Sequence, residues 1–393
     1  MVAVFGERTG ECGFSVSGGA RVTFSNVTAF ACANECFVST HTTQLSILGG
    51  GLVLRSGRFL ASNDGGHNHH TARIGAWVEG GRWENTGDDV CHFSSLVISA
   101  ETRIDDQNGA TTLRLRCSSG DKYCAHNQGG ANSQIAIGDV IQFFNRSTTS
   151  GEMIGERVVV EVTTVPASEA ARKHGAKLQT LVTFAAPPLP RLDLGVITNS
   201  DKNSINTVTN VFDLNTTASQ FVFRGNKVMS GRRFGVLGKG QRLSIINNSF
   251  IGLGSGAVNY LNSVTEGLCA RHAIFRDNLV LDAVQLAEHG DMPDFTPSGA
   301  LWANVAPSVV GTTRSLGGAG KCHRDLVCKL EVTGERRALA ICSPRSALTH
   351  LRLFYLRLFL SQLFANNIID SGPHPVMKLY DVESAQFVGN EVT

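Results

Sequence analysis

The sequence has no excess of charge of either sign. Lys and Arg total 35 against 33 Asp and Glu, and charged residues make up only 17% of the 393 residues. Nucleic acids and anionic membranes attract proteins mainly through an excess of Lys and Arg. We therefore expect neither nucleic acid nor an anionic membrane surface as a partner.

Long apolar segments, a secretion leader and closely spaced cysteine pairs are also missing. The longest apolar stretch, Leu351 to Phe364, contains two arginines and is shorter than the roughly 20 residues that span a bilayer, so we expect no membrane span. The N-terminal segment shows no signal peptide, because no basic region precedes an apolar core. No Cys-x-x-Cys pair occurs; Cys32 with Cys36, and Cys117 with Cys124, leave local disulfides or buried thiols open.

Glycine and short β-rich runs are abundant instead. The chain holds 42 Gly against 10 Pro. Runs of Val, Ile and Phe alternate with polar residues and are broken by Gly or Asn, as in VTFSNVTAF from Val22, FVFRGNKVMSG from Phe221 and LSIINNSFIG from Leu243. Phe24 and Ile47 are 23 residues apart, and Asn226 and Asn248 are 22 apart. This period indicates a repeat architecture.

A period of this length is typical of leucine-rich repeats and of β-solenoids. Leucine-rich repeats need leucines at fixed offsets, and these are missing, whereas Asn at the turn between two β-rich runs suits stacked coils. Each coil is expected to supply about three short strands, with coils about 4.8 Å apart. We predict an all-β fold, a right-handed parallel β-helix that carries a small inserted antiparallel β-domain.

The repeat is interrupted twice, which predicts five segments. Residues 1–100 are coils, 101–195 an inserted β-rich, barrel-like domain, 196–307 further coils, 308–364 an anomalous insertion and 365–393 a final coil. The anomalous insertion has no period and holds three of the ten cysteines. Two interpretations stay open for it: a stretch foreign to the fold, such as a translated intron, or an amphipathic helical insertion.

The candidate catalytic residues are three aspartates. Asp64 lies 24 residues before Asp88, which is one coil, and Asp89 follows directly. Residues one coil apart share an angular position in a β-helix, and Gly87 supplies the bend that lets both members of the doublet reach one site. Because ionised carboxylates repel one another, one member of such a cluster tends to keep its proton. A protonated acid beside a carboxylate suits an inverting glycosidase; solvated turn residues are the alternative.

The aspartate motifs also carry a resemblance to known families. The GDD motif with an Asp-Gly one coil upstream resembles the polygalacturonase-type β-helix hydrolases, although that family's Gly-His-Gly and Arg-x-Lys motifs are missing. The sequence is more similar to glycoside hydrolase family 110 and its β-helix relatives, which are inverting α-galactosidases. The matching segments are DGGH from Asp64, RIGAWVEGGRWENTGDD from Arg73, FRGNKVMSGRRFGVL from Phe223, IINNSF from Ile245 and EGLCARHAIFRDN from Glu266. They span most of residues 13–283 plus the tail from Ala365.

This resemblance implies hydrolysis of terminal α-linked galactose, including α-1,3-linked galactose, on an oligosaccharide or polysaccharide. Asp64, Asp88 and Asp89 would share the acid and base roles, with no metal and no organic cofactor. The substrate class and the Asn-x-Ser/Thr sequons favour an extracellular or secretory location. The sequence departs from the family pattern where Val90, Cys91 and His92 follow the doublet, so an inactive or incomplete chain is an alternative.

Further candidates would bind substrate. We expect His67 and His92 to donate hydrogen bonds to sugar hydroxyls, and Arg233 and Glu266, on later coils, to bind the sugar ring. The His-Asn-His-His run is interpreted as a flexible turn without metal-ligand spacing, so we expect no metal site. Two other readings stay open: a β-helix lyase or epimerase, and a non-catalytic glycan binder. The sequence does not indicate an oligomeric state.

Overall fold

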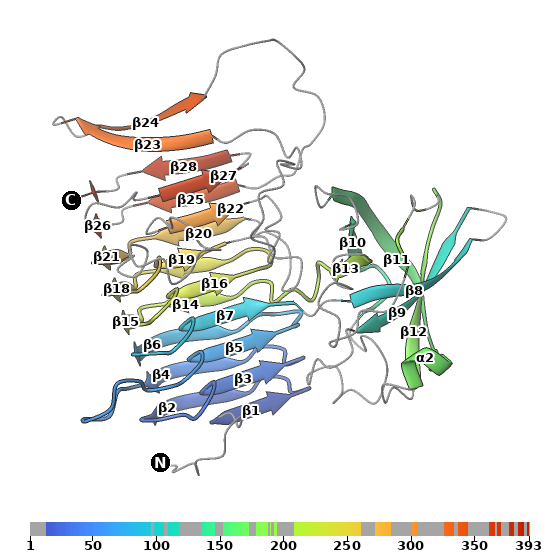
Figure 1. Cartoon of the computed structure of the whole chain (residues 1–393), viewed down its shortest axis with the longest axis horizontal. Coiled ribbons are helices and arrows are strands. Elements are labelled where there is room, and N and C mark those ends of the chain that lie inside the picture. The colour runs from blue at the N-terminus through green and yellow to red at the C-terminus, as the bar shows by residue number, and fades with distance from the viewer. Residues whose placement is uncertain are drawn as a thin grey trace, which may run out of the picture.

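The fold is that of a computed structural model, which describes the chain from residue 13 onwards. Within residues 13–283 the description omits 96–97, 106–108, 118–134, 146–151, 173–177, 188, 190–191, 195–207 and 261–271. Beyond residue 283 it covers the strands that are named below. These residues form stacked coils with a separate barrel beside them (Figure 1).

One long face of the stack is an eight-stranded sheet in which every neighbouring pair is parallel. Its strands are β1 (Phe14–Ser17), β3 (Phe37–Thr40), β5 (His67–His70), β7 (Cys91–Ser94), β16 (Val236–Gly238), β19 (Val258–Asn259), β22 (Leu301–Asn304) and β27 (Met377–Tyr380). Each strand comes from a different coil, so the sheet is built by stacking successive coils. We call the stack the solenoid.

A thirteen-stranded sheet forms the rest of the coil wall. Three long strands come first, and each later coil divides the same path into two short strands. The strands are β2 (Thr23–Ala29), β4 (Ser46–Leu52), β6 (Trp77–Glu84), β14 (Val222–Arg224), β15 (Lys227–Met229), β17 (Ser244–Ile246), β18 (Ser249–Ile251), β20 (Ala273–Arg276), β21 (Leu279–Leu281), β25 (Ser361–Ala365), β26 (Ile368–Asp370), β28 (Ser384–Val388) and β29 (Glu391–Val392). The bends lie at left-handed residues, with φ of 62° at Gly225, 56° at Asn247 and 57° at Asp277, where Gly, Asn and Asp are favoured.

The strand register shows the predicted period directly. Phe24 pairs with Ile47 in the parallel ladder. The predicted asparagine ladder is also present: Asn226 Nδ2 donates to Asn248 Oδ1 at 3.2 Å, and Asn248 Nδ2 donates to Asn278 Oδ1 at 2.9 Å. The three residues are each 2% exposed, so their amides satisfy one another inside the wall. The described strands therefore form a parallel β-solenoid, as the repeat predicted.

Apolar side chains fill the interior of the solenoid in rows that run from coil to coil. Val228, Phe250 and Val280 are directly opposite one another on adjacent strands and are fully buried. Phe93 stacks on Phe221 with ring centroids 3.9 Å apart. Burying one such side chain contributes roughly 1.5–3 kcal/mol, so these rows fix the order in which coils stack.

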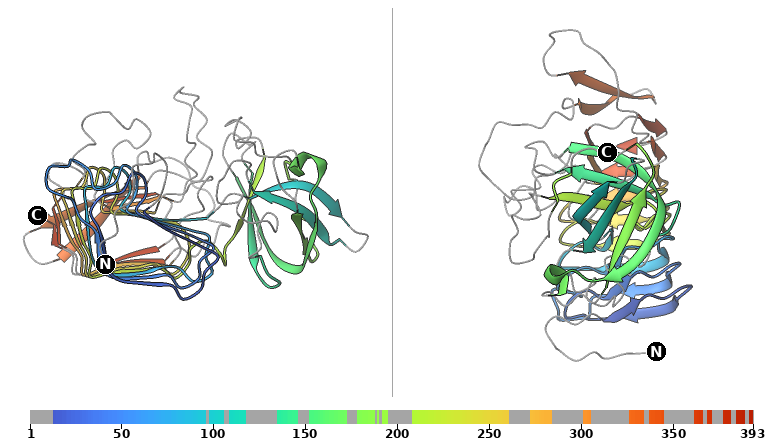
Figure 2. Two further views of the ribbon diagram at one scale, coloured as in Figure 1. Left: turned by 90° about the horizontal axis from the view of Figure 1, so that it is seen from below. Right: turned by 90° about the vertical axis from the view of Figure 1, so that its right-hand side faces the viewer.

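The inserted module is a closed antiparallel barrel with strand order β10-β11-β12-β9-β8-β13. Its elements are β8 (Ile98–Asp105), β9 (Thr111–Cys117), β10 (Val140–Asn145), β11 (Glu152–Pro166), the helix α2 (Glu169–Arg172), β12 (Leu178–Phe184) and β13 (Thr209–Asp213). The barrel runs further than the predicted 101–195, because β13 pairs with both β8 and β10 and closes it. Figure 2 shows the barrel beside the solenoid. Among the described residues, no helix has the length and apolar character needed to cross a bilayer.

An ion pair joins the solenoid to the barrel. Arg73 Nη1 donates to Asp139 Oδ1 at 2.8 Å, and its Nη2 donates to Asp139 Oδ2 at 2.5 Å. Asp213, which is 1% exposed, lies close enough for the negative charge of Asp139 to act on it. Burial, followed by the charge of Asp139, raises the pKa of Asp213 from 3.8 to about 7.

The segment 308–364 contains an antiparallel hairpin of β23 (Leu326–Thr333) and β24 (Arg337–Pro344). Figure 1 shows the hairpin at the C-terminal end of the solenoid. The helical interpretation is therefore wrong for these residues. Coil strands return with β25 at Ser361, earlier than the predicted residue 365. The hypothesis of a segment foreign to the fold stays a prediction.

The remaining cysteine predictions are resolved only in part. Cys32 and Cys36 form a disulfide, and Cys91 is a buried free thiol. Cys117 ends β9, and Cys124 lies outside the described residues.

The asparagine ladder predicts a large cost for a cut in its middle. Replacing Asn248 by Ala leaves the backbone N–H of Asn226 and the carbonyl of Phe223 without their partner, and each buried unpaired group costs about 1–3 kcal/mol. We expect a lower urea midpoint by circular dichroism. Asn247→Asp is the control, because this exposed residue has left-handed backbone that Asp tolerates. Equal midpoints for the two variants would contradict the prediction.

The raised pKa of Asp213 predicts a pH-dependent stability. The folded chain holds this proton more tightly than the unfolded chain, so the stabilisation is complete below about pH 4 and is lost as the pH rises to about 7. Asp213→Asn should flatten the pH dependence of the thermal midpoint in this window, measured by calorimetry. The exposed Asp277→Asn should keep it. An unchanged pH profile in Asp213→Asn would show that another group is responsible.

Candidate functional site

The aspartates lie in turns that connect the thirteen-stranded sheet to the eight-stranded sheet. Asp64 is three residues before β5, Asp88 three before β7, and Arg233 three before β16. In the ladder His67 pairs with Cys91, and Cys91 pairs with Val236. The same step therefore places Asp64, Asp88 and Arg233 at one angular position on three successive coils. We call these three residues the aspartate column.

Backbone contacts hold the first two members of the column together. The N–H of Asp88 donates to the carbonyl of Asp64 at 3.3 Å, and the N–H of Gly87 donates to the carbonyl of Ser62 at 2.9 Å. A Cβ on Gly87 would lie 2.2 Å from the carbonyl oxygen of Asn63. Gly is therefore required at this position, because any side chain would push the two aspartate turns apart.

The two turns repeat one hydrogen-bond pattern. Ser62 Oγ donates to the carbonyl of Asp64 at 2.7 Å, and Thr86 Oγ1 donates to that of Asp88 at 2.8 Å. In each turn the aspartate Oδ1 accepts the N–H of the next residue, at 2.9 Å for Asp64 and 2.8 Å for Asp88. Both aspartates are half-buried, so each presents a fixed carboxylate at the protein surface.

Asp89 and Arg233 complete the site from within. Asp89 is 3% exposed, and its Oδ1 accepts the N–H of Phe234 at 3.1 Å. Arg233 Nη1 contacts Asp88 Oδ1 and lies 3.6 Å from Asp89 Oδ2. One guanidinium thus balances charge in a cluster that contains three carboxylates. The doublet divides into an accessible carboxylate, Asp88, and a buried one, Asp89.

His92 lies one step further along the face of the eight-stranded sheet. It is opposite Asn68 on β5 and Leu237 on β16. Burial lowers the pKa of His92 from 6.5 to about 3, the charges of Lys239 and Arg233 lower it further, and Asp88 opposes them. The ring is therefore neutral at neutral pH and lies within electrostatic reach of the column.

Sequence reasoning missed two buried charged residues near this face. Lys239 is fully buried just after β16, and its charge acts on His92. Glu35 is 6% exposed, and its Oε1 accepts Asn68 Nδ2 at 2.9 Å. Coil counting pairs Glu35 with Gly65, so the fixed offset could have found Glu35. No such signal exists for Lys239, because the barrel separates it from His92 in the sequence.

One predicted site residue is corrected, and another cannot be placed. His67 is fully buried inside the solenoid, where it meets the Phe93 ring edge-on at 5.8 Å. Ser39 Oγ contacts His67 Nε2 at 3.3 Å and His69 Nδ1 at 2.5 Å. His67 therefore cannot reach a sugar from the surface, and the His-Asn-His-His run is strand β5 instead of a flexible turn. Glu266 lies outside the described residues.

Among the described residues, no cluster of three or more His, Cys, Asp or Glu has the arrangement of a metal site.

The comparisons with known proteins give a distant likeness. No protein-family model matches the chain, and no curated protein matches it. One solved structure that matches is the Azotobacter vinelandii mannuronan C-5 epimerase AlgE4 A-module, at 8% identity and a TM-score of 0.35. The match covers 95% of this chain and 54% of that one, so the chain spans about half of the length of the protein that it resembles. The resemblance to glycoside hydrolase family 110 stays a prediction, and the site is argued from its own residues.

The electrostatic position of His92 can be checked by NMR. We expect its ring to stay neutral over the range in which an ordinary histidine, with a pKa of 6.5, takes up a proton. Lys239→Met should raise the pKa of His92, because it removes a repelling cation, and Asp88→Asn should lower it. Lys227→Met, on the exposed surface, is the control. A His92 pKa that does not respond to Lys239→Met would contradict the geometry.

Proposed function

We propose that this protein is a carbohydrate-active enzyme that hydrolyses a glycosidic bond at the aspartate column. The specific reaction we propose is removal of terminal α-linked galactose from an oligosaccharide or polysaccharide, with inversion. The observation that carries the proposal is the position of Asp64 and Asp88 on adjacent coils, hydrogen-bonded through their backbones and both half-buried.

The two accessible carboxylates match the chemistry of glycoside hydrolysis. Such a reaction needs one carboxylic acid to protonate the leaving oxygen and one carboxylate to activate water. Asp64 and Asp88 supply this pair. Asp89 is buried and binds the Phe234 amide beside Arg233. In this proposal Asp89 is the residue that positions Arg233 against the column.

The winding and the location belong to the same proposal. A right-handed solenoid is supported by the general preference of crossovers between parallel strands, which follows from strand twist. Secretion is supported by Asn26 and Asn247, which begin Asn-x-Ser/Thr sequons and lie on the exposed surface, where N-glycosylation takes place in secreted proteins.

His92 and Lys239 favour a second candidate, a lyase or epimerase that acts on uronates. Such a reaction removes the proton next to a carboxylate, so it needs a base and a cation that stabilises the developing charge. A neutral His92 is a suitable base, and Arg233 and Lys239 are close enough to act on it electrostatically. The two candidates differ in product, since the lyase leaves an unsaturated sugar.

Substitution of the column tests the leading proposal. Asp64→Asn and Asp88→Asn should each lower kcat for p-nitrophenyl α-galactoside and α-1,3-galactobiose by about 10²–10⁴-fold, the usual contribution of a general acid or base. Inversion is checked by NMR of the first anomer released. Asp277→Asn is the control, because Asn suits the left-handed backbone there.

The wild-type protein decides between the candidates. Ultraviolet absorbance from polyuronates without galactose release would favour the lyase. No product from either substrate class, with glycan binding kept, would support a non-catalytic binder and reject the enzyme proposal.

A further inference from the structure

Five exposed cationic side chains surround the turn that carries Asp88. Two come from the loop before Asp64, two from adjacent strands of the thirteen-stranded sheet, and one from the turn before Arg233. They are Arg55, Arg58, Arg82, Lys227 and Arg232. We call them, together with the exposed ring of Phe59, the cationic strip.

The strip is one continuous surface. Lys227 pairs with Arg82 on neighbouring coils. The N–H of Arg232 donates to the carbonyl of Thr86 at 3.0 Å, two residues before Asp88. Asn85 Nδ2 donates to the carbonyl of Phe59 at 3.2 Å, which holds the Arg55–Phe59 loop against the same turn. The strip therefore borders the aspartate column on the side of the coil that precedes it.

The acidic groups near the strip are withdrawn from solvent. Glu84 is 6% exposed, accepts the N–H of Leu54 at 2.8 Å and pairs with Arg82. Asp88 and Asp89 pair with Arg233. Within the described part of the chain, Arg55, Lys227 and Arg232 have no acidic partner at ion-pair distance. An anion that approaches the strip thus meets exposed cations first.

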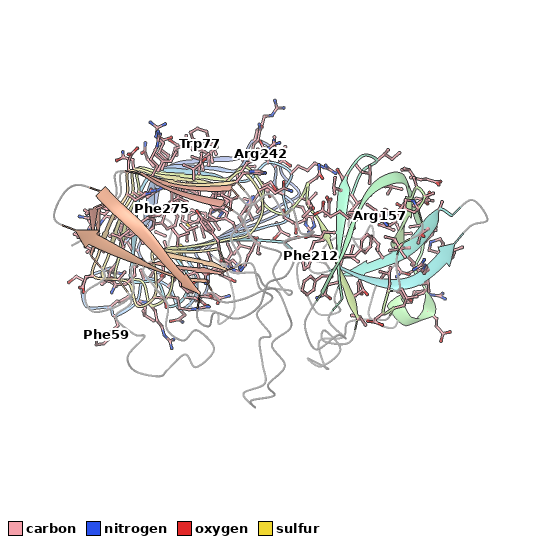
Figure 3. All side chains as sticks on the ribbon, turned by 90° about the horizontal axis from the view of Figure 1, so that it is seen from above. Phe59, Trp77, Arg157, Phe212, Arg242 and Phe275 are labelled. Carbon is pink, nitrogen blue, oxygen red and sulfur yellow. A yellow bond between two sulfur atoms is a disulfide. The ribbon has the colours of Figure 1, made fainter. Side chains whose placement is uncertain are left out.

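The opposite wall of the solenoid lacks this imbalance. There Arg224 lies 3.7 Å from Glu79, and Arg276 lies 3.1 Å from Asp277. In Figure 3, viewed along the solenoid, Arg242 and Trp77 lie on one side and Phe59 on the other. The concentration of unbalanced cations is therefore a property of the surface beside the column.

Phe59 gives the strip a feature that charge alone does not. Its side chain is 93% exposed, and Figure 3 shows it at the outer edge of the solenoid. An aromatic ring with an exposed face can pack on an apolar sugar face. A surface of several arginines and one such ring suits a chain that carries both sugar rings and anionic groups, because guanidinium binds carboxylate and related anions through paired hydrogen bonds.

We propose that the cationic strip binds an acidic polysaccharide, whose charge is carried by carboxylate or sulfate groups, and leads its end to the aspartate column. This inference rests on the proposed function for the column, but binding to the strip can be measured without turnover. A glycan is favoured over single-stranded nucleic acid because the strip has a single aromatic ring, where base stacking needs a series. It is favoured over a membrane because the strip lacks a broad apolar face.

Binding of the full-length protein tests the strip. The probes are a polyuronate, a sulfated galactan, a neutral galactan, single-stranded DNA and anionic phospholipid vesicles. We expect both acidic polysaccharides, or one of them, to bind more tightly than neutral galactan, with affinity that falls as salt is added. The triple variant Arg55→Gln, Lys227→Gln and Arg232→Gln should weaken that binding about tenfold, as expected when three exposed contacts of modest strength are lost.

The control carries the same change of charge on the opposite wall. It combines Arg224→Gln, Arg242→Gln and Arg276→Gln and should bind like the wild type. Equal loss in both triple variants, equal binding of neutral and acidic glycans, or DNA or vesicles bound as tightly as the acidic glycan would overturn the proposal. Acidic-glycan binding that needs the strip, without any turnover, would reject the catalytic proposal for the column and keep the strip.

Discussion

The parallel ladder that joins one coil to the next is the constraint on which the structure depends. Because strand pairing fixes the register, a residue is carried to the same angular position whenever the chain completes a coil. Asp64 and Asp88 meet for this reason, and Arg233 joins them although 144 residues lie between it and Asp88. The barrel can occupy that interval because it leaves the coil after β7 and returns before β14, so the ladder closes across the insertion.

The register also explains how much the sequence could predict. Where coils follow one another directly, a constant offset is visible, and it located the asparagine ladder and the pairing of Asp64 with Asp88. Arg233 was singled out on its coil, but its partners were not, since the offset across the barrel cannot be counted from the repeat. The buried Lys239 escaped for the same reason. The extent of the barrel was underestimated because β13, after a long interval, looks like part of the next coil.

The misplacement of His67 has a different cause. Residues alternate between the two faces of a strand, so a single residue of error in locating a strand exchanges inside and outside. Reading the His-Asn-His-His run as a turn left its faces undefined. As strand β5, it turns His67 and His69 toward Ser39 and Phe93, and Asn68 toward Glu35. The histidine that keeps a place near the column is His92, the residue opposite Asn68.

Charge shows why a whole-chain sum says little about a local surface. The chain is nearly neutral, yet the acids beside the aspartate column are spent on internal contacts: Glu84 on Leu54 and Arg82, and Asp89 on Phe234 and Arg233. The cations around them remain at the surface. An ordered carboxylate that accepts backbone N–H groups in a turn contributes to the fold while its charge is withdrawn from solvent. The same contacts that hold the aspartate turns in register therefore leave the surrounding surface positive.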